Sequence, residues 1–238
     1  MARPRAPLSR QRVLRAAIVL ADKGGIEALS MRKLAQKLGV EAMSLYNHVA
    51  NKDDLLDGIL ESIASEIDLA PDTADWKAAM RRRAISAHEV LSDHPWACSL
   101  WMSGPSSGGA RLRFADAVLR GLREAGFSPD LTYHGFHVIQ SYILGFTLQE
   151  QTADFDVKDL ETLAARFLRD FPADDYPDLA EHIRQHIEPD DDHEGAFAFG
   201  LDLILDGLER RATFRGCACP ESAEARRPAA RPKAGPRP

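Results

Sequence analysis

The chain has few cysteines and no long apolar run, and each shortage excludes a class of protein. No stretch of its 238 residues approaches the roughly 18 apolar residues that a membrane-spanning helix needs. The basic N-terminus leads into a charged amphipathic segment, unlike the apolar core of a signal peptide. Cys98 stands alone, and Cys217 and Cys219 lie in a Pro/Arg-rich segment, so we expect no disulfide framework. These features predict a cytoplasmic protein without a membrane partner.

Recognisable catalytic and metal-binding motifs are also missing. The sequence contains no nucleophile elbow, phosphate loop, HExxH or Cys-His signature, and scattered titratable residues are usual on helical surfaces. His88, His94, His134 and His137 fall into no zinc spacing. We therefore expect no catalytic residue, no metal and no cofactor. An enzyme and a purely structural helical module remain the alternative classes, and duplex binding with a steep salt dependence would separate them from a DNA-binding protein.

The charges are distributed unevenly along the chain. Residues 1–58 hold ten Lys/Arg against six Asp/Glu, a balance of +4. Because the net charge of the whole chain is −6, the remaining residues carry a net charge of −10. A basic head on an acidic body fits a head that meets a polyanion, although a solvated basic face would give the same count. The hydrophobic fraction of 45% predicts an ordinary packed core.

Apolar residues recur at helical spacing, without a β-alternating run or an internal repeat, so we predict an all-α fold. The first helix should begin near Ser9 and end at Gly24-Gly25, and a short second one should run from the N-cap Ser30 to Gly39. A third should span Glu41 to Val49, and Asn51 should cap a long fourth. Helix, tight glycine turn, helix is a helix-turn-helix pattern. Further helices are expected over about 76–93, 109–125, 130–151, 157–170, 177–188 and 194–211.

This pattern divides the chain into four parts. We expect a flexible basic arm over 1–8, a three-helix helix-turn-helix DNA-binding domain over 9–58, a larger helical ligand-binding and dimerisation domain over 59–215, and a disordered Pro/Arg-rich tail over 216–238.

The segment from Gly25 to Leu56 closely resembles the DNA-binding domain of the tetracycline-repressor (TetR) family. The turn glycine, the Leu45-Tyr46 pair, His48 and the Asn51-Lys52 step are all in register. The resemblance implies a transcriptional regulator, usually a repressor, that binds a palindromic double-stranded DNA operator as a homodimer. In the family a small-molecule effector releases the DNA.

The predicted Glu41–Val49 helix has few apolar anchors beyond Leu45 and Val49, so its polar groups are available to base edges and phosphates in the major groove. The family resemblance implies DNA contacts for several of them and for Arg32 in the preceding helix. The predicted DNA-binding residues are Arg32, Ala42, Met43, Ser44, Tyr46, Asn47, His48 and Lys52. Tyr46 in the small core, a surface His48 and a simple helix-start Lys52 are the alternative interpretations.

One pair of residues departs from the tetracycline repressors. Where those proteins tend to have glutamine and proline before the Ser/Thr, this chain has Ala42-Met43. These side chains offer only apolar contact, for example to a thymine methyl group. The operator should therefore differ from theirs.

The body resembles the tetracycline-repressor-like C-terminal domain over Tyr142–Gln151 and Phe197–Glu209. In the family these helices form a four-helix dimer interface, and Gly145, Gly200 and Gly207 would permit close backbone approach; burial in the chain's own core is the alternative. An apolar or aromatic effector should bind beside them. The predicted lining residues are Trp101, Met102, Phe114, His134, His137, Gln140, Ser141 and Tyr142. Leu100–Gly104, before Pro105, lacks the metal-chelating histidine of tetracycline repressors, so magnesium-tetracycline recognition is not implied.

Overall fold

The computed structural model describes residues 7–70, 75–103, 108–152, 169, 171–185 and 195–215. These residues form helices and contain no strand, which confirms the predicted all-α class. The helices are α1 (Arg10–Gly24), η1 (Ile26–Ala28), α2 (Met31–Leu38), α3 (Ala42–Leu45), α4 (Lys52–Ala64), α5 (Trp76–Asp93), α6 (Ala97–Met102), α7 (Gly109–Glu124), α8 (Pro129–Thr152), α10 (Pro177–Gln185) and α11 (Ala196–Arg215).

Local signals in the sequence begin and end the first three helices. Ser9 and Ser30 cap α1 and α2, each accepting a hydrogen bond from the backbone N–H three residues on. Gly39 ends α2 in the left-handed conformation, with φ 67° and ψ 42°, which a residue without a Cβ adopts at no steric cost. The tight turn of the predicted helix-turn-helix is therefore present.

The third helix is shorter than predicted. α3 covers Ala42–Leu45 rather than Glu41–Val49, and turn hydrogen bonds continue from it, with the Val49 N–H donating to the Leu45 carbonyl at 3.0 Å. Val49 is buried and α4 begins at Lys52. The chain must therefore leave the helical path within a few residues of Leu45 to reverse direction.

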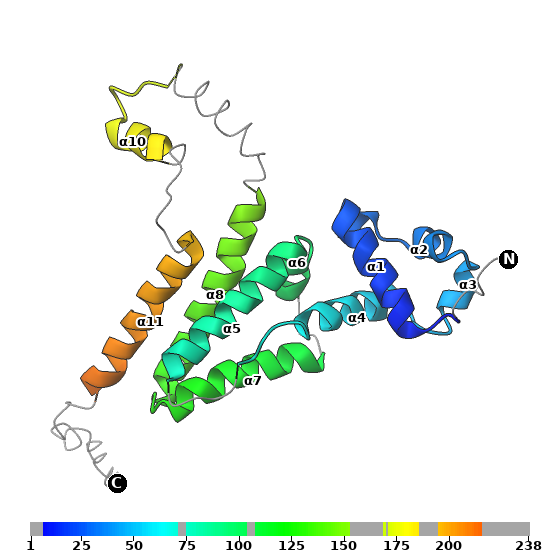
Figure 1. Ribbon diagram of the computed structural model, residues 1–238, viewed down its shortest axis with the longest axis horizontal. Helices are drawn as coiled ribbons and strands as arrows, with labels where there is room; N and C mark the ends of the chain where they lie inside the picture. The colour runs from blue at the N-terminus through cyan, green and yellow to red at the C-terminus, as the bar shows by residue number, and fades with distance from the viewer. Residues whose placement is uncertain are drawn as a thin grey trace, which may run out of the picture.

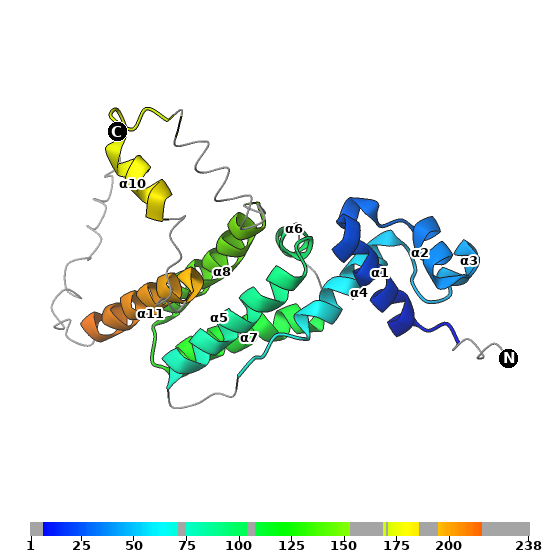
Figure 2. The ribbon, with the colours of Figure 1, turned by 45° about the horizontal axis from the view of Figure 1, so that its top comes forward.

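A single helix, α4, joins the two parts of the molecule. Figures 1 and 2 show α1, α2 and α3 at one end, with α4 leading from them to the remaining helices. Ile59, Leu60 and Ile63 are buried in its second half. The predicted boundary between residues 58 and 59 therefore falls inside a continuous helix.

The body is a layered bundle of α5, α7, α8 and α11, with α6 against the end nearer α4 (Figure 1). The sequence predicted no helix between about 93 and 109, where the structure has α6, which buries Ala97, Cys98 and Trp101. A six-residue apolar segment is too short for periodicity to identify it. α10 lies apart from these helices in both views (Figures 1 and 2).

The remaining predicted helices agree with the structure to within a few residues wherever it describes them. α5, α7, α8, α10 and α11 correspond to the ranges predicted above. The helix expected over 157–170, apart from residue 169, lies outside the described residues, as do residues 1–6 of the arm and the tail over 216–238. Within the described part of the chain, no helix is long and apolar enough to cross a membrane.

Candidate DNA interface and ligand-binding body

The short α3 is anchored on one side and open on the other. Leu45 and Val49 are 0% and 1% exposed and hold the segment to the core, whereas Met43 is 75% exposed and Tyr46 is 45% exposed. The ring of Tyr46 therefore does not lie within the small core. Among the predicted DNA-binding residues, the exposed ones are Arg32, Met43, Tyr46, Asn47 and Lys52, and the half-buried ones are Ala42, Ser44 and His48.

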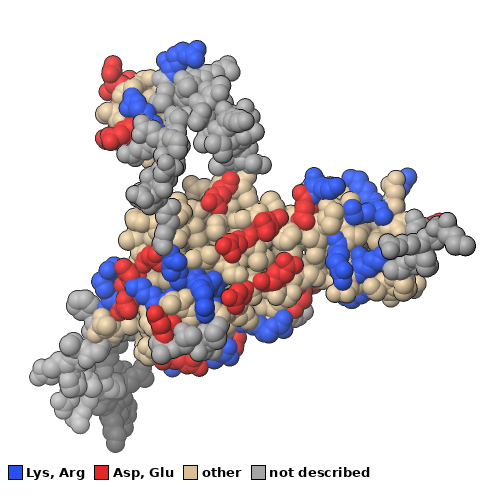
Figure 3. All heavy atoms as spheres, in the orientation of Figure 1, with Lys and Arg blue, Asp and Glu red and all other residues tan. Residues whose placement is uncertain are grey.

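The electrostatic asymmetry of the sequence is visible on the surface. Figure 3 shows Lys and Arg side chains gathered over the end formed by α1 to α3, and a row of Asp and Glu side chains over the adjoining part of the body. A positive surface at the end that carries α3 favours contact with a polyanion. The view covers one face of the molecule.

Besides the continuous helix α4, two side-chain contacts between residues far apart in the sequence connect α1 and α4 to the body. One carboxylate oxygen of Asp22, in α1, accepts a hydrogen bond from Trp96 Nε1 at 2.7 Å. The same oxygen lies 2.8 Å from His94 Nδ1. Glu61 of α4 accepts the Ala110 N–H at the first turn of α7, at 2.6 and 2.8 Å from its two oxygens. These contacts therefore fasten α1 to the turn before α6, and α4 to the first turn of α7.

The predicted ligand-binding residues divide into separate groups, the first of which lies at α6 and α7. Trp101 and Phe114 are buried edge to face, with ring centroids 5.9 Å apart. Arg111 covers the Trp101 ring, its guanidinium carbon 5.8 Å from the centroid. Burial lowers the pKa of Arg111, and Asp57 and Glu61 partly offset that effect. Met102 is exposed.

The second group lies on the outside of α8. His134, His137 and Ser141 are exposed, and the side chain of His134 is 65% accessible. His134 and His137 contact the ring of Tyr133 rather than Trp101 or Phe114. Helical spacing placed the two histidines on one face but could not tell whether that face points inward, because α8 is apolar around more than one face.

The third group lies where α8 meets α11 and α5. Tyr142 donates a hydrogen bond to the Phe197 carbonyl at 2.9 Å and stacks on the Phe197 ring. The sequence did not identify the ring at its centre, His88, which stacks on Phe197 with centroids 4.0 Å apart and lies 2.9 Å from Thr147 Oγ1. Burial lowers the pKa of His88, partly offset by Glu150. The sequence offered one signal for this cluster, because His88 is a polar residue beside the buried positions Ala84 and Ala87 of α5.

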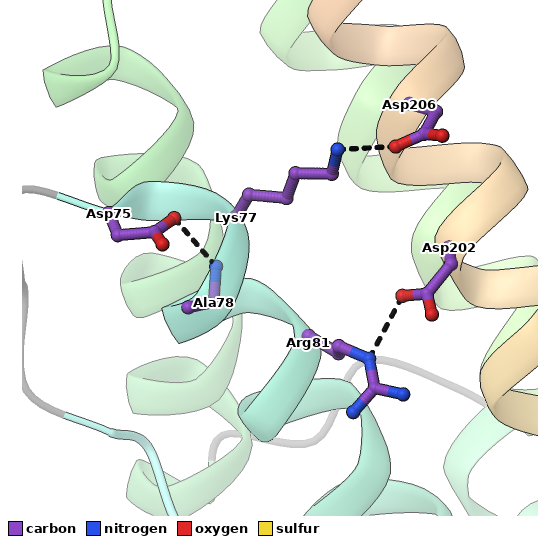
Figure 4. A pocket seen from close by; sticks show the side chains of 6 residues that line it. All are labelled: Asp75, Lys77, Ala78, Arg81, Asp202 and Asp206. Carbon is purple, nitrogen blue, oxygen red and sulfur yellow. Dashed lines mark hydrogen bonds and ion pairs between the residues drawn. The ribbon is translucent and has the colours of Figure 1, made fainter. Parts of the chain in front are cut away.

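A solvent-open cleft of about 470 Å³ separates the start of α5 from α11. Figure 4 shows that charged side chains line it and pair across it. Lys77 bonds Asp206 and also Glu209, and Arg81 Nε donates to Asp202 at 2.9 Å. None of the predicted ligand-binding residues lines this cleft. The ion pairs across it join α5 to α11.

A helix-turn-helix head with an exposed third helix, joined to a helical body, defines a DNA-binding regulator. The family model of bacterial regulatory proteins of the tetR family matches residues 13–59, and that of the tetracyclin repressor-like C-terminal domain matches residues 70–212. The chain therefore belongs to the tetR family and is a DNA-binding transcriptional regulator, as the sequence resemblance predicted.

Individual relatives agree over most of their length. The HTH-type transcriptional repressor DrrR1 of Streptomyces coeruleorubidus is 32% identical over 216 residues, covering 87% of this chain and 79% of that protein. The tetracycline repressor class A from transposon 1721 of Escherichia coli is 32% identical over 206 residues, covering 84% and 89%. The structure of ActR from Streptomyces coelicolor in complex with actinorhodin is 25% identical, with a TM-score of 0.69 over 87% and 99% of the two chains.

Proposed function

We propose that this protein is a cytoplasmic homodimeric repressor, which binds a palindromic operator and leaves it when an apolar or aromatic small molecule binds in the body. The observation that carries the proposal is the geometry of α3, whose apolar anchors face the core while Met43 and Tyr46 face solvent. Such a helix fits the major groove. Relatives named as repressors support the direction of control.

The outer face of α8 and α11 supports dimerisation. On α8, His134, Val138, Ser141, Gly145 and Leu148 follow one another at steps of three or four and are exposed. On α11, Phe199 is 66% exposed and Leu203 56% exposed. Exposed apolar surface shared by two packed helices marks an interaction site. A second copy there would place two α3 helices on successive major grooves, about 34–36 Å apart.

From the placement of the side chains we infer different tasks in DNA binding. Lys52, exposed at the first turn of α4, would meet a phosphate, which also removes the conflict between a lysine and the positive end of the helix dipole. Met43 would contact the apolar edge of a base, such as a thymine methyl group. Arg32, Ser44, Tyr46, Asn47 and His48 complete the surface with polar groups for bases and backbone, and Ala42 packs beneath it.

For the effector site, the interior positions are the better candidates. Trp101 and Phe114 give a buried aromatic wall, and Gln140 and Tyr142 on α8 are half-buried. These residues would hold an apolar or aromatic ligand with a few orienting polar groups. We assign the exposed His134, His137 and Ser141 to the dimer face instead. The complex of ActR with actinorhodin shows that a relative's fold accommodates a ligand.

The test of DNA recognition uses two substitutions in the full-length dimer. Tyr46→Ala and Lys52→Ala should each weaken binding to duplexes from the region upstream of the protein's own gene while leaving a folded dimer. Loss of Lys52 should lower affinity for all sequences alike and reduce the salt slope by about one unit. Tyr176→Ala, which truncates an exposed tyrosine outside α1 to α4, is the control. If Tyr46→Ala unfolds the head and Lys52→Ala leaves binding unchanged, this recognition surface is wrong.

The test of control is a thermodynamic cycle. A compound found by thermal shift should bind operator-bound protein more weakly than free protein, and by linkage it should weaken DNA binding by the same factor, roughly 5- to 150-fold. Trp101→Ala should reduce compound affinity while leaving DNA affinity unchanged without the compound. Equal compound affinity for the two states would exclude release by this ligand.

A further inference from the structure

Arg10, in the first turn of α1, reaches across the head to the chain that follows α3. Its Nη2 donates to Asp54 Oδ1 at 2.6 Å, and its Nη1 donates to Asp54 Oδ2 and to the His48 carbonyl, each at 2.9 Å. The planar guanidinium forms this fork-like arrangement, which a single ammonium group cannot reproduce. One side chain thus connects α1 with the backbone at His48, just after α3, and with Asp54 in the first turn of α4.

Asp54 extends the same network into the backbone between α3 and α4. Its Oδ2 also accepts the Ala50 N–H at 2.7 Å, and its own N–H donates to the N-cap side chain of Asn51 at 2.8 Å. The hydrogen bond from Arg10, followed by that from Ala50, lowers the pKa of Asp54 to about 2. The carboxylate is therefore charged at every pH at which the protein would meet DNA.

Close packing of α1 on α4 accompanies this contact. Gly58 is buried, and a Cβ at this position would lie 2.7 Å from Leu14 Cδ2 and 3.2 Å from Arg10 Nη2. The missing side chain at Gly58 thus leaves room for both Leu14 and the Arg10 guanidinium against α4. The reach of Arg10 to Asp54 depends on that room.

We infer that Arg10 and Asp54 are positioning residues for operator recognition, which act by fixing the backbone from His48 to Asn51. This segment lies between the exposed Tyr46 and Lys52, so its conformation sets how the two side chains stand relative to each other. Binding groups must be held to within about 0.5 Å to act together, and ordering a loose segment on binding costs affinity. The inference rests on the proposed function, because it assigns these residues to the same surface.

Comparing two substitutions that remove the same charge distinguishes a positioning role of Asp54 from a purely electrostatic one. Asp54→Asn and Asp53→Asn each remove one negative charge from the first turn of α4, which by charge alone strengthens binding to any DNA. If Asp54 positions the segment, Asp54→Asn should instead weaken operator binding by roughly 10- to 100-fold, the range for a lost charged hydrogen bond. Its affinity for a scrambled duplex should stay unchanged or rise. Asp53→Asn, an exposed neighbour, should keep the ratio of operator to scrambled affinity.

Arg10 requires its own control, because its side chain is 45% exposed and a phosphate contact would also weaken binding when lost. Arg10→Gln should reduce the operator-to-scrambled ratio without changing the salt slope, and Arg10→Lys should recover part of the loss through a single ion pair. A salt slope lower by about one unit in Arg10→Gln would identify a phosphate contact. That result would overturn the positioning role of Arg10.

The experiment uses the full chain, with tiled duplexes from the DNA flanking its own gene and a scrambled duplex of equal composition. If the unsubstituted protein shows no preference among the tiles, the proposed function fails. If it prefers one tile and Asp54→Asn keeps that preference, only the inference fails. Circular dichroism checks folding, and if Asp54→Asn does not fold, the Arg10→Lys and Arg10→Gln pair decides.

Discussion

The head, from α1 to the start of α4, and the body are stabilised internally by contacts that span different distances along the sequence. In the head, the caps from Ser9, Ser30 and Asn51 each join groups three residues apart. In the body, Lys77 and Arg81 of α5 pair with acids of α11 more than 120 positions away. Local contacts leave a signature in a short window of sequence, whereas long-range ones do not.

The difference has a functional counterpart. In the head, the Arg10–Asp54 contact adds a link between α1 and α4 to these local caps. The helices of the body are joined by ion pairs between distant positions and by a core of buried apolar side chains. Substitutions should therefore act narrowly in the head and broadly in the body.

The largest effect should come from two glycines of α11 that differ in their surroundings. A Cβ at Gly207 meets nothing within 4 Å among the described residues, whereas one at Gly200 would lie 2.9 Å from Tyr142 Cζ. If the proposed dimer forms through α8 and α11, Gly207→Leu should leave the subunit folded but separate the two copies, at a cost of roughly 1–3 kcal/mol per overpacked site. Sedimentation velocity should show monomers that no longer bind operator.

Gly200→Leu is the companion variant, because it should displace Tyr142 within the subunit and lower the melting temperature. A Gly207→Leu protein that remains fully dimeric would show that the second copy does not pack on this part of α11.

The next effect concerns Arg83, which is 2% exposed and bonds the carbonyls of Leu69, Ala70 and Ala117. Arg83→Met keeps the apolar stem but leaves buried carbonyls without this donor, which should destabilise the body by roughly 1–3 kcal/mol. Each kcal/mol lowers Tm by about 2–4 °C in a chain of this size. Arg82→Met, at an exposed neighbour, should leave Tm unchanged. Equal Tm values for the two variants would contradict a role for these bonds.

A smaller and more local effect is expected at Ser30. Ser30→Ala removes the cap of α2, in which Ser30 Oγ accepts the Lys33 N–H at 3.2 Å, and should cost about 1 kcal/mol. Hydrogen exchange should rise in α1 to α3 and stay unchanged in α8 and α11. Faster exchange throughout the body would show that the head and body unfold as one unit, against the distinction drawn here.

The smallest effect is a pH dependence of the body. Because burial lowers the pKa of His88, the unfolded chain binds a proton more readily, and the stabilising contribution of neutral His88 is complete above about pH 6.5. It declines as the pH falls below that value. His88→Phe retains an aromatic ring without a titrating group, so its Tm should fall less than that of the unsubstituted protein between pH 8 and pH 5.5. Parallel Tm curves would show that His88 does not contribute.

The same distinction explains what could be predicted from the sequence. The caps at Ser30 and Asn51 and the turn at Gly39 were identified correctly, because each depends on neighbours within four residues. The cluster around His88 was missed, since its partners Thr147 and Phe197 come from other helices.

The predicted ligand-binding residues illustrate the limit. Trp101 and Phe114 do meet, but His134 and His137 lie on the opposite, exposed side of α8. Helical periodicity gives the residues that share a face and says nothing of which face is covered when a helix is apolar all round. Only the packing of α5, α7 and α11 on α8 decides that.

The continuity of α4 limits how such regulators can be recombined. Leu55 in its first half and Ile63 in its second half are both buried, and the helix packs on α1 as well as on α5, α6 and α7. A chimaera that exchanged heads between residues 58 and 59 would join half of α4 from one protein to half from another. Glu61 would then no longer belong to the same protein as the head. A graft extended to Ala64 would carry Glu61 along, and it would then require a recipient whose α7 begins with a backbone N–H at the position of Ala110.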